Sequence, residues 1–149
     1  MTTIDTSVLA RLQELADRAD LTDLLAHQGR WLNERRFDDT ASVFTDDATV
    51  TTPGGQAQGI EALTAHARRS HARFDRTQHV TSNVLIDLDG DRATVHANLI
   101  ATFVSDATAP EPTFTLGERY HFEAVRTPQG WRFSAVDATP VWQSGELPQ

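Results

Sequence analysis

The stretch Thr77-Gln78-His79-Val80-Thr81-Ser82-Asn83 begins an alternating run of strand-forming residues, shortly after an arginine-rich segment with a helical pattern. Alternate residues of a strand point to opposite faces, so His79 can face the inner side of a curved sheet. The unperturbed pKa of imidazole lies near physiological pH, so this side chain can accept and donate a proton. The pattern predicts proton-transfer chemistry on a small organic molecule if His79 enters a pocket. A buried histidine with a structural hydrogen bond is the alternative.

Strand patterns continue to the C-terminal end of the chain. Asp89-Gly90 is a tight-turn signal, and Pro128-Gln129-Gly130 joins the last two candidates. Strand-forming residues bounded by such turns predict strands over 77–87, 92–105, 113–126 and 130–142.

Helical patterns dominate the part of the chain before His79. Apolar residues at helical spacing predict a helix over 7–36, with a possible break near Asp20. A short helix over 38–44, a strand over 48–52 ended by Pro53-Gly54-Gly55, and a helix over 59–74 follow. Helices followed by antiparallel strands indicate the α+β class. We expect a single domain over 1–149, built as one curved, mostly antiparallel sheet with the helices on its concave face and a pocket between them.

The composition excludes several classes of protein. The 149-residue chain has a net charge of -8, which disfavours general nucleic-acid binding. It contains no cysteine, and all 13 of its cationic residues are arginine, so thiolate and lysine Schiff-base chemistry are excluded. No apolar run is long enough for a membrane span, and the first residues lack a signal-peptide pattern. We therefore expect a cytoplasmic protein without membrane contact.

The sequence contains no recognisable metal or cofactor motif. His66 and His71 are five residues apart on a predicted helix and do not share a face, and the remaining histidines lie on separate elements. Pro53-Gly54-Gly55 lacks the strand-to-helix context of a dinucleotide site. We expect neither a metal nor a cofactor.

The order and spacing of several segments resemble the nuclear-transport-factor-2-like superfamily, within it the SnoaL-like and scytalone-dehydratase-like group. The resemblance runs from about Asp20 to Gly145. It is carried by Leu21–Asn33, Phe44–Ala48, Thr77–Asn83, Leu88–Ala93, Gly130–Phe133 and Trp142. The resemblance implies that the curved sheet forms a cone-shaped barrel. It implies no particular substrate, because this fold hosts many functions.

The resemblance also implies roles for individual residues. His79 matches the catalytic base of the dehydratases. The dehydratases have a second catalytic histidine, and its position corresponds to about Thr102 in this chain. Many relatives have an acidic residue late in the first long helix, where this chain has Asn33. We expect Thr102 and Asn33 to contact the substrate, although both departures count against scytalone-type dehydration.

Strand alternation supplies partners for His79. Trp131, Phe133, Ala135 and Asp137 share one face if no bulge intervenes, so Asp137 could orient the imidazole. A carboxylate on an apolar face needs a partner, and Arg30 is another candidate for that role. A strand-end aspartate in water is the alternative for Asp137.

The next strand presents two alternative sets of residues to the pocket. Glu118 and Tyr120 lie on an apolar face of this strand, and Arg119 and His121 lie on the opposite face. If the apolar face lines the pocket, Glu118 could act as an acid and Tyr120 could donate a hydrogen bond that stabilises an oxyanion. A shift of one residue would exchange the two sets.

Five further residues are candidates for substrate binding, and four of them have a structural alternative. They are Asn83 (a strand-end hydrogen bonder), His96 (an outward histidine), Arg30 (a surface ion pair), Trp31 (core packing) and, through the resemblance, Asn33.

These features predict a cofactor-independent lyase, isomerase or cyclase that acts on a small hydrophobic carbonyl compound, polyketide-like or aromatic. The rival is a non-catalytic domain that binds a small ligand or another protein. A transport adaptor is less well supported, because no exposed hydrophobic patch is evident from the sequence. The resemblance implies a homodimer or larger homo-oligomer, formed through the outward residues of the last three strands.

Overall fold

The computed structural model describes residues 3–148, with two helices, a short 3₁₀ helix and six strands. The helical part comprises α1 (Thr6–Asn33), the 3₁₀ helix η1 (Phe37–Ser42) and α2 (Ile60–His71). A hairpin of β1 (Phe44–Thr52) and β2 (Gly55–Gln58) lies between η1 and α2. The remaining strands are β3 (Arg76–Asp89), β4 (Arg92–Val104), β5 (Phe114–Thr127) and β6 (Gly130–Gly145).

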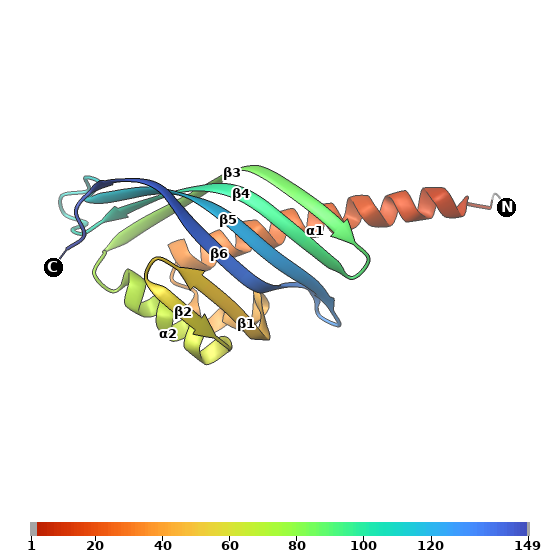
Figure 1. The fold of residues 1–149 in the computed structure, drawn as a ribbon, viewed down its shortest axis with the longest axis horizontal. Coiled ribbons are helices and arrows are strands. Elements are labelled where there is room, and N and C mark those ends of the chain that lie inside the picture. Colours follow the sequence, from red (N-terminus) through yellow and green to blue (C-terminus); the bar gives the residue numbers. More distant parts are fainter. Residues whose placement is uncertain (1–2, 149) are drawn as a thin grey trace.

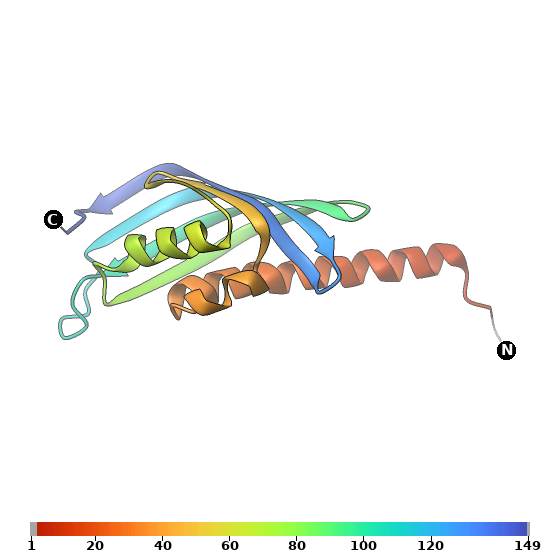
Figure 2. The same ribbon diagram turned by 90° about the horizontal axis from the view of Figure 1, so that it is seen from below.

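The strands form one curved sheet in the order β2-β1-β6-β5-β4-β3 (Figure 1). The β1–β6 pair is parallel, and the other neighbours are antiparallel. The sheet does not close, so β2 and β3 are its edges. Figure 2 shows α1 and α2 beneath the arch of the sheet, which confirms the α+β class and the helices on the concave face.

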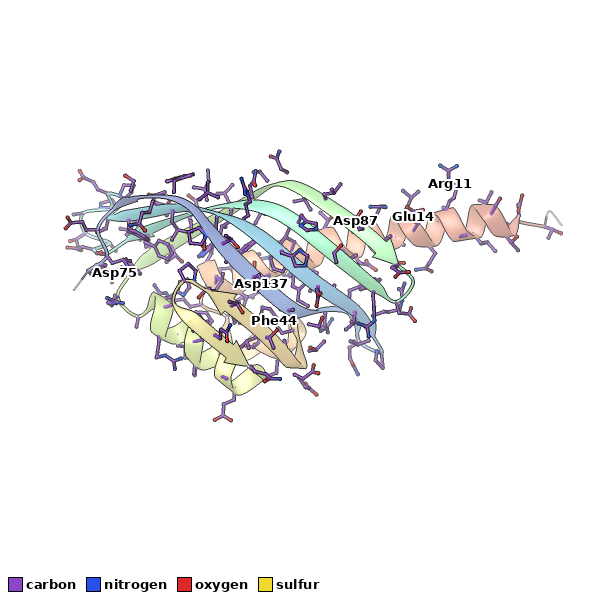
Figure 3. All side chains as sticks on the ribbon, in the orientation of Figure 1. Arg11, Glu14, Phe44, Asp75, Asp87 and Asp137 are labelled. Carbon is purple, nitrogen blue, oxygen red and sulfur yellow. The ribbon has the colours of Figure 1, made fainter. Side chains whose placement is uncertain are left out.

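Helix α1 is continuous through Asp20, so the break that was considered near this residue is absent. The Asp5 carboxylate accepts a hydrogen bond from the backbone N–H of Ser7 and caps the first turn (2.9 Å). From Asp17 onward the helix packs under the sheet, with Leu21, Leu24 and Leu25 buried. The first half projects beyond the sheet and carries Arg11 and Glu14 (Figure 3).

Asp17 ties α1 to the far end of the sheet. Arg126 on β5 donates to both carboxylate oxygens, at 2.7 and 2.8 Å, and Trp131 Nε1 donates at 3.2 Å. The hydrogen bonds from Arg126 lower the pKa of the Asp17 carboxyl to about 2, although burial opposes them. This contact anchors α1 to the sheet and helps to set where its C-terminal residues lie.

The strand patterns of the sequence locate most of the sheet but not β2. The Pro53-Gly54-Gly55 break is a hairpin turn, since Thr52 pairs with Gly55 and Thr49 with Gln58. On β4 the alternate residues Val95, Ala97, Leu99 and Ala101 are buried, as expected for a strand with one face on the core.

Candidate active site

A cavity of about 340 Å³ lies between the concave face of the sheet and the helices. Its walls are mainly apolar, with Leu63 from α2, Leu99 and Phe103 from β4, and Phe114 from β5. Trp142 on β6 also lines it, and a Cβ on Gly117 would clash with the Trp142 indole nitrogen. Glycine at position 117 therefore allows Trp142 to pack across β5.

His79 lines this cavity from β3, and Asn33 holds its ring. The Asn33 carbonyl oxygen accepts from the backbone N–H of His79 at 2.9 Å and meets ring Nδ1 at 2.8 Å. Because the backbone N–H can only donate, the Asn33 atom facing it must be the oxygen. Nδ1 therefore carries the ring proton, and Nε2 keeps its lone pair. Asn33 was predicted to contact a substrate, and in the structure it orients the imidazole.

The surroundings of His79 favour the neutral ring. Burial, and secondarily the nearby His71 ring, lower the pKa of His79 from 6.5 to about 3. The centroids of the two imidazole rings are 5.6 Å apart. Asn33 carries no charge that would raise the pKa again. His79 is therefore a neutral hydrogen-bond acceptor at physiological pH.

Glu118 and Tyr120 both face the cavity, so β5 has the first of its two possible phases. Oε2 of Glu118 is buried without a hydrogen-bond partner, and burial raises the pKa of this carboxyl. Burial also raises the pKa of the Tyr120 phenol, while a hydrogen bond with Gln28 opposes that shift. Both groups are thus favoured in their protonated forms, which can donate hydrogen bonds.

Trp31 serves as both core and cavity wall. It is buried and packs edge-on against Phe37 and Phe44, while its indole N–H donates to the Thr40 hydroxyl at 3.1 Å. This hydrogen bond satisfies the polar end of the ring, so the part that reaches the cavity is apolar.

Asp137 lies outside the cavity, and its predicted pairing with His79 is wrong in this structure. A β-bulge between Phe133 and Ala135 leaves Ser134 unpaired with β5. Beyond it Val136 and Ala138 are buried, and Asp137 is exposed on the outer face (Figure 3). The extra residue reversed the alternation on which the prediction depended.

Four other predicted substrate contacts also lie away from the cavity. On β4, His96 and Thr102 alternate with the buried residues and lie on the outer face, where His96 Nδ1 stands 3.4 Å from His121 Nδ1. Asn83 is exposed at a β-bulge of β3, with φ of 55°. Arg30 forms an exposed ion pair with Glu34 at 3.0 Å, which was its structural alternative.

The sequence reasoning missed several polar residues that line the cavity, among them Gln28, His66 and His71. The signal for His71 was present, because Leu63, Ala67 and His71 are spaced one turn apart and all three are buried. His66 lies on a neighbouring face of α2 and meets the Thr52 hydroxyl at 3.1 Å. The two histidines do not share a face, yet the cavity is wide enough for both to line it.

Within residues 3–148, no group of three or more His, Cys, Asp or Glu side chains is placed to hold a metal ion. In the same residues, no helix is long and apolar enough to cross a membrane.

The family model described as SnoaL-like domain matches residues 13–137. The chain belongs to the SnoaL-like domain family. This SnoaL-like protein is 29% identical over 142 residues to the uncharacterised protein Rv2910c of Mycobacterium tuberculosis H37Rv, which covers 94% of this chain and 95% of that protein. An uncharacterised Mycobacterium bovis protein, Mb2934c, matches to the same extent.

Solved structures share the fold of this SnoaL-like protein. The Kfla4162 protein of Kribbella flavida superposes with a TM-score of 0.81 at 27% identity, over 88% of this chain and 95% of its own. A candidate scytalone dehydratase of Novosphingobium aromaticivorans gives 0.80 at 20%, over 91% of both chains. A hexachlorocyclohexane dehydrochlorinase, LinA type 2, gives 0.78 at 21%, over 93% and 97%. At these identities, the last two similarities show the fold alone.

Proposed function

We propose that this SnoaL-like protein is a cofactor-independent lyase, isomerase or cyclase acting on a small hydrophobic carbonyl compound, polyketide-like or aromatic. One observation carries the proposal. His79 lines an apolar cavity with its proton fixed on Nδ1 by Asn33, which leaves the lone pair of Nε2 as an acceptor. An oriented, neutral imidazole is the form in which histidine acts as a general base.

The proposed first step is removal of a proton from the carbon next to the carbonyl. The proton moves to Nε2 of His79, and the electron pair of the C–H bond moves toward the carbonyl oxygen. The carboxyl of Glu118, in the protonated form that its burial favours, donates a hydrogen bond to the developing oxyanion, and Tyr120 donates a second. An apolar cavity that excludes water strengthens these hydrogen bonds.

The second step decides the class of reaction. Return of the proton to another carbon completes an isomerisation, attack of the enolate carbon on a second carbonyl closes a ring, and departure of a group from the adjacent carbon completes an elimination. The names of two structural neighbours, a dehydratase and a dehydrochlorinase, both denote eliminations. They favour the lyase among the three reactions.

A non-catalytic ligand carrier is the second candidate. Asn33 is neutral, and the pKa of His79 is lowered to about 3, so the site does little to stabilise an imidazolium. Native mass spectrometry after exposure to metabolite extracts separates the two candidates. An unchanged bound ligand supports the carrier, and a ligand that returns with the mass of one water missing supports the lyase.

Hydrogen exchange tests the base without knowledge of the substrate. We expect the protein to catalyse deuterium uptake from D₂O at the carbon next to the carbonyl of cyclic ketones such as 1-tetralone, measured by NMR. The His79→Gln variant should lose this catalysis at least about 100-fold, the usual contribution of a general base, and keep its melting temperature. The matched control His121→Gln removes an imidazole from the outer face and should exchange at the wild-type rate. Wild-type rates in His79→Gln would refute the proposal.

A further inference from the structure

His71 places another imidazole against the cavity, on helix α2, which the proposed mechanism does not use. It is the last residue of α2 and is 5% exposed. Its Nδ1 lies 2.9 Å from the backbone carbonyl of Ala67. Since a carbonyl oxygen can only accept, Nδ1 carries the proton, and Nε2 is left as an acceptor.

That Nε2 atom is buried and has no hydrogen-bond partner. An acceptor left unpaired in the interior costs about 1–3 kcal/mol, so such atoms are rare unless they serve a ligand or a water molecule. The His71 ring packs against Phe37 and Phe103, with centroids 6.0 and 5.9 Å apart. These aromatic neighbours offer no hydrogen bond to satisfy Nε2.

Glu118 presents a second unpaired group to the same cavity. Its Oε2 is also buried without a partner. His79 also lines the cavity, and its ring contacts Asn33 through Nδ1, so Nε2 is its acceptor. The polar groups on the cavity walls therefore include two imidazole acceptors and one carboxyl, and most of the other lining side chains are apolar. A ligand that satisfies this set needs hydroxyl donors and an apolar body. Burial favours the uncharged forms of Glu118, His71 and His79, so these three groups offer no charge to pair with an ionic ligand.

We propose that His71 is a specificity-determining residue, which accepts a hydrogen bond from a hydroxyl group of the substrate, and that the substrate class is neutral, hydroxylated ring compounds. The ring centroids of His71 and His79 are 5.6 Å apart, so one small ring can present hydroxyl groups to both. The proposal rests on the proposed function only in that the same cavity binds the substrate.

Binding of a matched pair of probes tests this role without turnover. Trp31 and Trp142 line the cavity, so binding of 1,3-dihydroxynaphthalene and 1,3-dimethoxynaphthalene can be followed by tryptophan fluorescence. Wild type should prefer the diol, and His71→Phe should reduce that preference about tenfold, the loss of one hydrogen bond of about 1.4 kcal/mol. His71→Gln, which keeps an acceptor, should retain part of the preference.

The control is His27→Gln, at an exposed position of α1, and it should bind both probes as wild type does. Thermal melting of each variant shows whether it folds. If His71→Phe does not fold, the binding preference of His71→Gln decides the test. Equal affinity of wild type for the two probes, absence of binding included, overturns the proposal. So does an unchanged preference in the folded His71 variants. Because no chemical step is measured, failure here is distinct from failure of the deuterium-exchange test.

Discussion

At the residue scale, the pair of Asn33 and His79 determines which proton-transfer chemistry the cavity can support. A carboxylate at position 33 would hold the same imidazole proton and also supply a negative charge to balance an imidazolium. The amide keeps the orientation and omits the charge. His79 is therefore well oriented but weakly basic, since burial and the His71 ring already lower its pKa.

Asn33→Asp tests the consequence of this missing charge. We expect the variant to raise the pKa of His79 by at least one unit, because a carboxylate in contact with the ring favours its protonated form. Deuterium uptake into 1-tetralone should rise by about tenfold, since a stronger base removes the proton faster. NMR titration of the imidazole measures the pKa. A His79 pKa that stays near 3 would contradict this account of the pair.

Alternation along strands predicted several residues of the site, and bulges explain the failures. Glu118 and Tyr120 were expected on one inward face, and they line the cavity. Asp137 was expected inside, but the unpaired Ser134 reverses the alternation before it. A bulge of this kind leaves no clear mark in a single sequence. His71 was missed for another reason. The sequence reasoning considered it only as a metal ligand, although it continues the buried face of α2 that Leu63 and Ala67 form.

At the scale of elements, Asp17 is a polar anchor between α1 and the sheet. Asp17 is 5% exposed and receives hydrogen bonds from Arg126, Trp131 and Gln13. Arg126 also binds Asp91 at 2.9 Å and lies over the Trp131 ring. Since Asn33 lies at the other end of the same helix, this contact also helps to set the geometry at His79.

Asp17→Asn should therefore destabilise the fold. The amide cannot accept the two charge-assisted hydrogen bonds from Arg126, and we expect a loss of roughly 2–3 kcal/mol, below the full effect of a buried pair because Arg126 is partly exposed. Urea unfolding measures the change in free energy. Asp20→Asn, at an exposed position one turn along α1, is the matched control and should change it by less than about 0.5 kcal/mol. Equal effects of the two variants would show that Asp17 does not hold the helix.

The helices and long strands were predictable because their apolar residues repeat at a regular spacing and clear turn signals separate them. The four-residue β2 was not, since Gly55–Gln58 has no alternating apolar pattern and contributes no fully buried residue. Its pairing with β1 comes from the tertiary structure: the turn at Pro53-Gly54 returns the chain alongside β1 before α2 begins. Short edge strands of this kind leave little pattern in a sequence.

At the scale of the whole molecule, the structure exposes more apolar surface than the sequence suggested. Val8, Leu9, Leu12 and Leu15 are each 47–64% exposed on the projecting half of α1 (Figure 1). Ile100, Val141 and Trp142 are exposed on β4 and β6. The expectation that no hydrophobic patch would be evident was wrong. Self-association through the outward residues of the last three strands stays a prediction, and these residues are compatible with it.

The buried imidazoles make the stability of the whole fold sensitive to acid. The pKa of His79 is lowered to about 3, and burial also lowers that of His71. Between these pKa values and the unfolded value near 6.5, the unfolded chain binds more protons than the folded one. The free energy of unfolding therefore falls as the pH drops below about 6.5. Asp17 acts in the same direction at lower pH, from about 4 downward, because its pKa is also lowered.

Urea unfolding between about pH 7 and about pH 4 measures this effect, and His79→Gln isolates the contribution of His79. Wild type should lose up to a few kcal/mol over this range, and the variant should lose clearly less, because glutamine does not titrate. Glu118 opposes the trend, since its raised pKa lets the folded state retain a proton, but it is present in both proteins and cancels in the comparison. Equal acid sensitivity of the two proteins would mean that His79 ionises as freely in the folded chain as in the unfolded one, which its burial beside His71 should prevent.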